Sequence, residues 1–509
     1  MTKRSFDEMK VFLQKLSHED MIQLKALLHR HGSTVSKLQL TIAGSAKITE
    51  NNLIEILNFF PILTDLKLKV WEKSLFLENA RTEDFLRLFS LRKLNFFGSL
   101  RVLVIFTNLL PRHVLNDLTY SGNQQCSDTW YSFISTQLAI KKLNLDGCFT
   151  SAVPFTKLQL THLKITFRDQ YSTDNLSFMK SFIFSQTNLT DVDVRCNTRT
   201  NTWKINEKVI STFSLLLNLE TFKLNIDHIK AWKIQFLSNF PKLKKLEIYA
   251  CHEKSLATIA KLSLINNLGA ENLKLHTMNH EVSCNVFKQL SRNFMNLKSL
   301  EISFIEKHKI NFFIIHFPNL ESLKLTYGNE TNVISLADVF DSGENDHRKL
   351  KSLSLRFYDV KVVSKNLFFD LRFSFMELEK FEFHSKLPLS RSFLIILHAS
   401  LAKIKSLKMS HFKVENKFVD KDLVDCLITL RLKLKFVELT LRNVQNFSRS
   451  SVPIRGHLRQ ESCEERDPNF SYQSLANALT TYYKFKIVKI GQNKLYRELI
   501  LTASPQKLM

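Results

Sequence analysis

One hydrophobic pattern recurs along almost the whole chain and limits the fold more than any other feature. In this motif an apolar residue is followed by further apolar residues three and five positions later, as in Leu243, Leu246 and Ile248. Clear copies begin at Leu63, Leu160, Leu189, Leu219, Leu243, Leu297, Leu320 and Leu350, and weaker copies at Val35, Leu100, Ile140, Ala270, Leu378, Ile404 and Phe436. From Leu160 onward, successive copies start 23 to 32 residues apart. This self-similarity predicts a stack of about fifteen repeats rather than a set of separate globular domains.

The motif itself explains how each repeat folds. Its second half alternates between apolar and polar residues, which is the pattern of a short strand with one buried face. Residues 206–217 and 281–294 between motifs have apolar residues at helical spacing. Strand and helix alternating at this period predict an α/β leucine-rich-repeat solenoid. We expect a horseshoe with a parallel sheet on the concave side and helices on the convex side, because helices are wider than strands.

The ends of the chain depart from the repeat pattern. Ser5 with Glu8 and Ser17 with Asp20 have the spacing of helix capping boxes, so two N-terminal helices are expected. Residues 119–128 are polar and predict a surface loop. Runs at 485–490 and 495–501 predict two strands near the C-terminus. The predicted organisation is a helical N-terminal cap at 1–34, a solenoid at 35–446 with insertions near 71–99 and 106–138, a disordered loop at 447–470 and a C-terminal cap at 471–509.

Several functional classes find no support in the sequence. The seven cysteines are scattered and never form a C-x-x-C pair, which argues against a disulfide framework and a structural zinc site. No H-E-x-x-H, G-x-S-x-G or G-x-x-x-x-G-K-S/T motif occurs. We therefore predict no catalytic residues, no metal ligands and no cofactor. We found no apolar run long enough for a signal peptide or a membrane span, so we expect an intracellular monomer, cytoplasmic or nuclear, without a membrane partner.

Charge is the remaining functional signal. The chain has 72 Lys and Arg against 48 Asp and Glu, a formal net charge of +24. Polar residues between the apolar strand positions should face the concave side, because successive strand residues point to opposite faces. Many of them are basic. The candidate partner-binding residues are Lys164, Lys223, Lys274, His276, Lys324, Arg356 and Lys408.

Three roles stay open for this basic stripe. It could be a solvated face whose lysines discourage aggregation, a site for an acidic protein segment, or a track for a nucleic-acid backbone. Acidic residues such as Asp193, Glu247 and Glu301 interrupt the stripe, and mixed charge suits a protein better than a uniformly negative phosphate chain. We found no Arg-rich run and no RNA-binding aromatic motif, which further disfavours nucleic acid.

Phe-Pro-x-Leu opens the repeats at Phe60, Phe240 and Phe317. Together with residues 27–40, which look like the entry to a first repeat, this resembles F-box/leucine-rich-repeat proteins. The resemblance implies a non-catalytic substrate-recognition subunit of an SCF ubiquitin ligase, in which the repeats hold a substrate and an F-box docks the ligase adaptor. No Leu-Pro opening occurs near the N-terminus, so the F-box itself is not recognisable. The alternatives are a general protein-interaction scaffold or a nucleic-acid-associated protein.

Residues 448–469 are expected to be dispensable for folding. They are rich in Ser, Arg and Glu and have no apolar periodicity. Replacing them with a short linker should leave the thermal midpoint nearly unchanged in a calorimetric scan. A large drop would show that this segment packs on the solenoid.

Overall fold

The fold was analysed in a computed structural model of the 509-residue chain. The structure describes residues 7–14, 18–43, 46, 48–71, 75–76, 88–98, 101–125, 128–148, 156–168, 181–197, 213, 215–225, 236–250, 269–277, 284–305, 310–328, 333–335, 349–358, 361–363, 377–384, 388–389, 405–414, 436–442, 486–493 and 496–503. The chain forms two compact units, Met1–Leu246 and Glu247–Met509, which we describe separately. In the described residues, no helix combines the length and apolarity needed to cross a bilayer.

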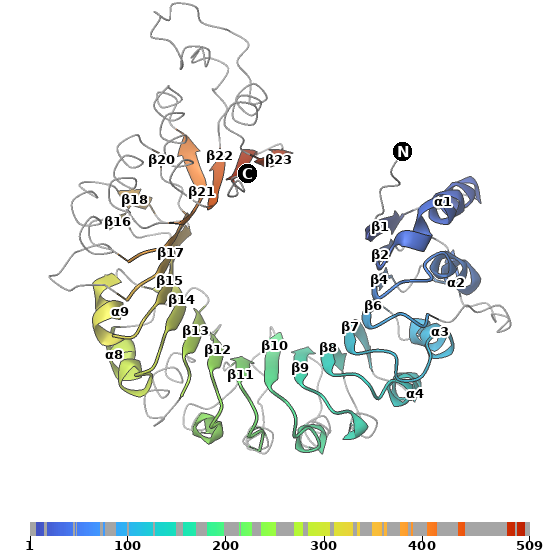
Figure 1. Ribbon diagram of the computed structural model, residues 1–509, viewed down its shortest axis with the longest axis horizontal. Coiled ribbons are helices and arrows are strands. Elements are labelled where there is room, and N and C mark those ends of the chain that lie inside the picture. Colours follow the sequence, from blue (N-terminus) through green and yellow to red (C-terminus); the bar gives the residue numbers. More distant parts are fainter. Residues whose placement is uncertain are drawn as a thin grey trace, which may run out of the picture. The chain divides into compact units, whose positions relative to one another are not determined.

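Unit 1 is a stack of parallel strands with helices on one side (Figure 1). Its strands are β1 (Glu8–Leu13), β2 (Lys37–Ile42), β3 (Ile48–Thr49), β4 (Asp65–Val70), β5 (Leu75–Phe76), β6 (Lys93–Gly98), β7 (Asp117–Gln125), β8 (Lys142–Cys148), β9 (His162–Arg168), β10 (Asp191–Asn197) and β11 (Thr221–Asn225). Its described helices include α1 (His18–His31), the 3-10 turn η1 (Gly32–Thr34), α2 (Glu50–Asn58), α3 (Arg101–Leu109) and α4 (Asp128–Thr136). β1, β2, β4 and β6 to β11 pair in chain order, all parallel, while β3 pairs with β5.

Unit 2 continues the same design, and the unit boundary falls inside β12 (Lys245–Ala250). Its other strands are β13 (Asn272–Thr277), β14 (Ser299–Ile305), β15 (Ser322–Gly328), β16 (Val333–Ser335), β17 (Ser352–Tyr358), β18 (Lys361–Val363), β19 (Lys380–His384), β20 (Pro388–Leu389), β21 (Ser406–Val414), β22 (Phe436–Arg442), β23 (Lys486–Asn493) and β24 (Tyr496–Ala503). Its described helices are α8 (Cys284–Asn293) and α9 (Ile310–His316). β13, β14, β15, β17, β19, β21 and β22 pair in parallel, with β20 beside β21 and β16 beside β18.

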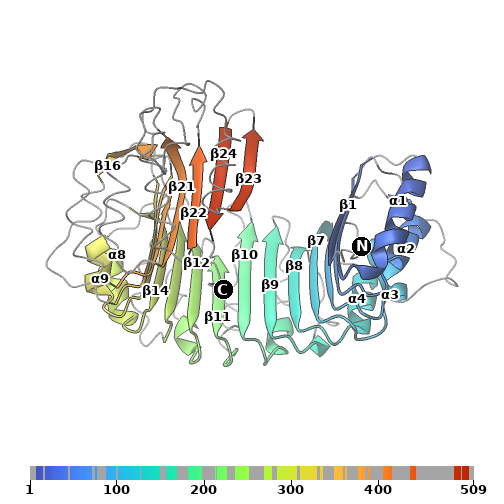
Figure 2. The same ribbon diagram turned by 45° about the horizontal axis from the view of Figure 1, so that its top comes forward.

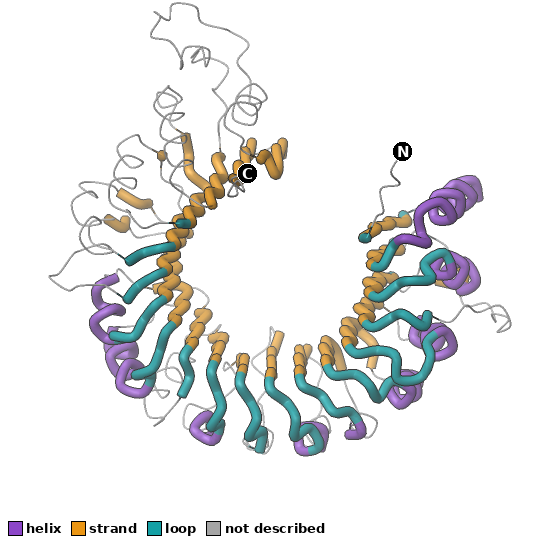
Figure 3. The backbone as a smooth tube through the Cα atoms, viewed as in Figure 1, coloured by secondary structure: helices purple, strands orange, loops and turns teal. Residues whose placement is uncertain are grey.

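The apolar motif positions form buried columns in each unit, as the sequence predicts. In unit 1, Val192 registers with Leu163 on one side and Phe222 on the other, and all three are at most 1% exposed. In unit 2, Leu300 registers with Leu323, and both are also at most 1% exposed. Each unit is therefore an α/β leucine-rich-repeat solenoid. Its strands line the inner side of its curve, and its helices lie on the outer side (Figure 3).

A repeated backbone contact fixes this register. The carbonyl oxygen of Thr161 accepts hydrogen bonds from two consecutive amides of the next repeat, those of Thr190 at 2.9 Å and Asp191 at 3.1 Å. The carbonyl of Glu321 does the same for the amides of Lys351 and Ser352. We call this contact the carbonyl clamp. It recurs between most neighbouring described repeats within each unit and places equivalent motif positions side by side.

The N-terminal cap differs from the sequence prediction of two helices. The second helix is confirmed as α1, but the first is the strand β1, which pairs with β2. Met9, Val11 and Leu13 alternate along β1 and register with the buried residues of β2. Residues 7–14 therefore provide a repeat strand, because the neighbouring strand offers partners that an isolated helix would lack.

The prediction of insertions near 71–99 and 106–138 also needs correction. β6 and β7 lie within these ranges and pair in parallel with their neighbours, so the ranges hold ordinary repeat strands. Their motifs start at Leu91 and Leu115. The copy predicted from Leu100 is wrong, since its later positions Leu103 and Ile105 lie in helix α3, and the loop predicted at 119–128 is largely strand β7.

The C-terminal region is described only in part. The predicted pair of tail strands is confirmed as β23 and β24, which form an antiparallel hairpin on β22 (Figure 2). The copy predicted at Phe436 is displaced by two residues, because Val437 registers with Leu407. The predicted loop at 447–470 and most of the predicted helix at 206–217 lie outside the described residues.

Leu163→Ala should reduce the free energy of unfolding by about 2–5 kcal/mol, because it removes buried methyl groups from a packed column. Leu217→Ala is the matched control in the same unit, since this leucine is 59% exposed, and its effect should be within about 0.5 kcal/mol. Urea unfolding followed by circular dichroism measures both variants. Equal effects would show that the columns do not carry the stability of the unit.

Candidate functional site

All seven predicted partner-binding residues lie on strands of the two units. All but Lys408 stand between two buried residues of their strand, and Lys408 holds the equivalent register position opposite Glu382, so these side chains belong to the face opposite to the leucine columns. Lys164 and Lys223 are in unit 1, on β9 and β11. The others are in unit 2: Lys274 and His276 on β13, Lys324 on β15, Arg356 on β17 and Lys408 on β21.

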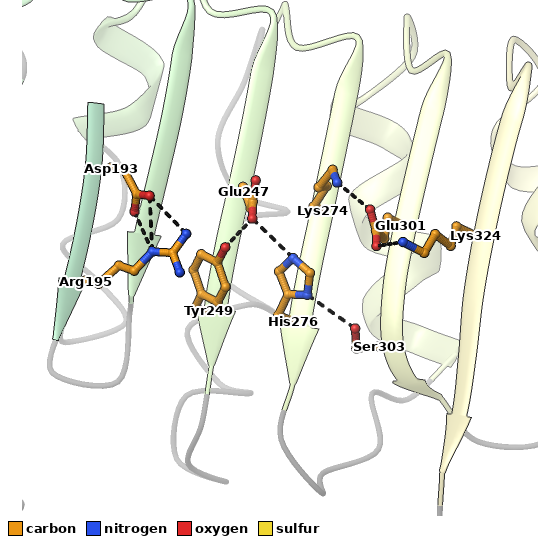
Figure 4. A network of polar contacts seen from close by, with 9 residues as sticks. All are labelled: Asp193, Arg195, Glu247, Tyr249, Lys274, His276, Glu301, Ser303 and Lys324. Carbon is orange, nitrogen blue, oxygen red and sulfur yellow. Dashed lines mark hydrogen bonds and ion pairs between the residues drawn. The ribbon is translucent and has the colours of Figure 1, made fainter. Parts of the chain in front are cut away.

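Two of the lysines meet at one carboxylate. Glu301 on β14 lies between Lys274 and Lys324 in the strand register. The Lys274 Nζ is 2.5 Å from Glu301 Oε2, and Lys324 pairs with Oε1 (Figure 4). Burial would raise the pKa of Glu301, but hydrogen bonds and ion pairs with both lysines outweigh it and hold the pKa below its ordinary value of 4.5. This cluster therefore carries one net positive charge at neutral pH rather than two.

His276 belongs to a second cluster in unit 2. Its Nε2 lies 3.4 Å from Glu247 Oε1, and its Nδ1 lies 3.3 Å from the Ser303 hydroxyl. The Tyr249 hydroxyl donates to the same Glu247 oxygen, and the tyrosine ring stacks on the imidazole with centroids 4.8 Å apart. Figure 4 shows the four side chains converging from β12, β13 and β14. The side chain of Glu247 is 9% exposed, and the hydrogen bond from Tyr249 satisfies part of its carboxylate in this nearly buried position.

The remaining basic residues of unit 2 also face a carboxylate. The Arg356 Nη2 lies 3.9 Å from Glu382 Oε2, which also accepts a hydrogen bond of 3.1 Å from Ser354. Lys408 registers opposite Glu382 on the other side. Glu382 thus interrupts the basic stripe in the same way as Glu301.

In unit 1 the carboxylate between two stripe lysines is paired with an arginine of its own strand instead of with those lysines. Asp193, with a side chain 6% exposed, is bound by the guanidinium of Arg195, whose Nε and Nη2 donate to both carboxylate oxygens at 2.9 to 3.1 Å. Asp193 registers between Lys164 and Lys223. Because Arg195 occupies both of its oxygens, Lys164 forms no ion pair within the described part of the chain. Lys164 can therefore offer its charge to a partner.

Sequence reasoning missed the residues that complete these clusters, namely Arg195, Tyr249 and Ser303. Two signals in the sequence could have located them. Arg195 and Tyr249 stand two positions after Asp193 and Glu247, so each shares a strand face with its carboxylate. Ser303 and His276 occupy the same position of the motif in consecutive repeats. The row of Lys274, Glu301 and Lys324, by contrast, follows from the motif positions and is confirmed by the strand register.

Chemically, the arrangement is a surface of paired charges and hydroxyl groups. Among the described residues, no group of three His, Cys, Asp or Glu side chains could hold a metal ion. Because the carboxylates are held by specific donors, the surface offers hydrogen-bonding groups in fixed positions. Such a surface is suited to binding a polar partner over several repeats.

Comparisons with known proteins give only distant structural matches. No protein-family model matches the chain, and no curated protein matches it. Among solved structures, the chain resembles LegL7, a leucine-rich repeat-containing protein from Legionella pneumophila, at 15% identity over 63% of this chain and 91% of that chain, with a TM-score of 0.36. It also resembles the yeast Rad7 and Elc1 complex, at 12% identity over 81% of this chain and 76% of that chain, with a TM-score of 0.29.

Glu301→Gln should lower the free energy of unfolding by about 1–2 kcal/mol at pH 7, because two charge-assisted hydrogen bonds lose their anion. A carboxylate with a lowered pKa stabilises the folded state above its unfolded pKa and loses this effect as the pH falls through the folded value. The difference between the wild type and the variant should therefore shrink below about pH 4.5.

Glu271→Gln is the matched control for this prediction. Its ion pair with Lys298 is exposed on both sides, so its loss should cost less than about 1 kcal/mol. Urea unfolding at pH 7 and pH 4 measures both variants. A difference for Glu301→Gln that does not depend on pH would contradict the assigned ion pairs.

Proposed function

We propose that this protein is a non-catalytic scaffold that binds a protein partner on the strand faces of its repeats. One observation carries the proposal. The buried column residues stay apolar from repeat to repeat, while the exposed positions beside them carry varied, specifically paired polar side chains. Folding of the sheet does not require the polar side chains to differ from repeat to repeat. Recognition of an extended partner does, because each repeat then contacts a different part of the partner.

The residues proposed to contact the partner are those predicted from the sequence. In unit 1, Lys164 and Lys223 flank the neutralised Asp193 and supply positive charge. In unit 2, Lys274, Lys324, His276, Arg356 and Lys408 surround three carboxylates and present mixed charge. This favours a partner with acidic groups at defined positions. The protein acts as an intracellular monomer without a cofactor.

The finer proposal is a substrate-recognition role of the kind found in F-box/leucine-rich-repeat proteins. Its support is the resemblance of the repeats, with their Phe-Pro-x-Leu openings, to that family. Within the N-terminal residues 7–14, where the family would place an adaptor-docking helix, the chain forms the repeat strand β1. A general protein-interaction scaffold without a ubiquitin-ligase role is therefore the second candidate.

Affinity purification of the tagged full chain followed by mass spectrometry tests the proposal. Lys164→Glu combined with Lys223→Glu should reduce the recovery of specific partners about tenfold or more, because like charges facing each other across an interface cost several kcal/mol. Lys157→Glu combined with Lys288→Glu, two exposed sites outside the strands, should leave recovery unchanged. Circular dichroism checks that both variants fold.

The same experiment separates the candidate functions. Recovery of a cullin-ligase adaptor would support the substrate-recognition role, and partners without an adaptor would support the general scaffold. Binding that disappears after nuclease treatment and falls steeply with salt would instead indicate a nucleic-acid-associated protein. Equal partner recovery by the strand variant and its control would contradict binding through the strand face of unit 1.

A further inference from the structure

Unit 1 also presents an exposed group of aromatic and basic side chains on its first strands. Lys67 and Lys69 lie on β4, Trp71 directly follows β4, Phe97 lies on β6 and Phe12 on β1. We call these five residues the aromatic–lysine patch. Phe12, Lys69 and Phe97 share one row of the sheet, because Phe12 registers with Thr41, Thr41 with Lys69, and Lys69 with Phe97. The patch therefore lies on the same face as Lys164.

Large apolar surfaces of the patch remain open to solvent. Phe12 is 65% exposed and Trp71 is 47% exposed. Burying apolar area contributes roughly 25 cal/mol per Å², so covering these two rings would add substantially to the free energy of binding a partner. Aromatic residues of this kind are enriched where interfaces form. On a strand face that otherwise presents polar side chains, two such exposed rings indicate a contact site.

The aromatic side chains are held in a defined arrangement. The Trp71 and Phe97 rings meet edge to face with centroids 6.1 Å apart, and Lys69 Nζ lies 4.8 Å from the Trp71 centroid and 5.1 Å from that of Phe97. Such cation–π contacts hold the ammonium and both rings together. Gly98, with φ of +145°, lets the end of β6 approach the Val70 carbonyl, where a Cβ atom would lie only 2.2 Å away. The backbone beside the patch is thus fixed by close packing.

The patch also has surplus positive charge. Elsewhere on these strands, Lys37 pairs with Asp7, and Lys93 lies 3.9 Å from both Asp65 and Asp117. Within the residues that the structure describes, neither Lys67 nor Lys69 forms an ion pair. The neighbouring aspartates thus already have lysine partners, while the ammonium groups of Lys67 and Lys69 remain able to form an ion pair with a carboxylate.

We propose that the aromatic–lysine patch binds an extended protein segment in which a carboxylate side chain stands next to a large apolar side chain. The apolar side chain would cover Trp71 and Phe97, and the carboxylate would pair with Lys67 or Lys69. This inference rests on the proposed function and assigns one contact site to it. Asp65 on β4 itself and Asp117 on β7 interrupt the positive charge of this face, whereas a phosphate backbone presents negative charge continuously, which favours a protein segment over nucleic acid.

Selection of a random dodecapeptide display library on the full chain tests this proposal. We expect enriched peptides with Asp or Glu beside Trp, Phe, Leu or Met. Fluorescence anisotropy with the labelled peptide should show an affinity loss of about tenfold or more for Trp71→Ala and for Lys67→Glu. The matched controls are Phe184→Ala, at a ring 67% exposed on another part of unit 1, and Lys157→Glu. Both should bind like the wild type, and circular dichroism verifies folding.

Several outcomes would overturn the proposal. Enriched peptides without acidic residues, no enrichment at all, or equal binding by Trp71→Ala would remove the patch as the site. Labelled dT12 that binds more tightly than the peptide and loses affinity with Trp71→Ala would assign the patch to single-stranded nucleic acid. If Trp71→Ala keeps the cellular partners that Lys164→Glu with Lys223→Glu loses, the patch inference fails while the proposed function stands.

Discussion

The carbonyl clamp is the contact on which the rest of each unit depends. In unit 1, the carbonyl of Thr161 accepts the amides of Thr190 and Asp191, and equivalent carbonyls recur from one repeat to the next. Because a strand slipped by one residue would turn its leucines to the solvent, a fixed register is what keeps the apolar columns buried. The same register lines up equivalent side chains of neighbouring repeats in rows across the sheet, and neighbours within a row are about 5 Å apart. The clusters at Asp193 and Glu301 are consequences of this geometry.

Most of the fold could be predicted from the sequence, and two of the failures share a cause. Apolar residues at positions one, four and six fit a strand, but the first two also lie on one face of a helix. The copy predicted from Leu100 runs into helix α3, whereas the copy that starts at Leu91, nine residues earlier, contains strand β6. The prediction for residues 7–14 was wrong in the opposite direction. Ser5 with Glu8 has the spacing of a capping box and predicts a helix, but the segment contains strand β1. Only the neighbouring strand decides between the two, and a single segment does not contain that information.

The candidate site was predictable in position but not in charge. Motif alignment placed the basic residues correctly on the exposed strand face. It did not show that Lys274 and Lys324 both pair with Glu301, or that Arg195 binds Asp193 through two nitrogens. Pairing depends on side-chain reach and on competing donors, which composition does not record. A formal charge of +24 therefore overstates what these rows of the sheet offer to a partner.

The distribution of unpaired charge then suggests where selectivity arises. Where every lysine of a row already pairs with a carboxylate, an acidic partner can bind only by replacing an existing ion pair, so the net gain in binding free energy is small. Lys67, Lys69 and Lys164 have no such competitor among the described residues, and Lys69 lies against the exposed ring of Trp71. Under the proposed function, binding energy should therefore concentrate around these three lysines of unit 1, which bring no competing ion pair and, at Trp71, adjoin exposed apolar surface. The paired rows of unit 2 would contribute specificity, because a mismatched partner would leave their carboxylates without donors.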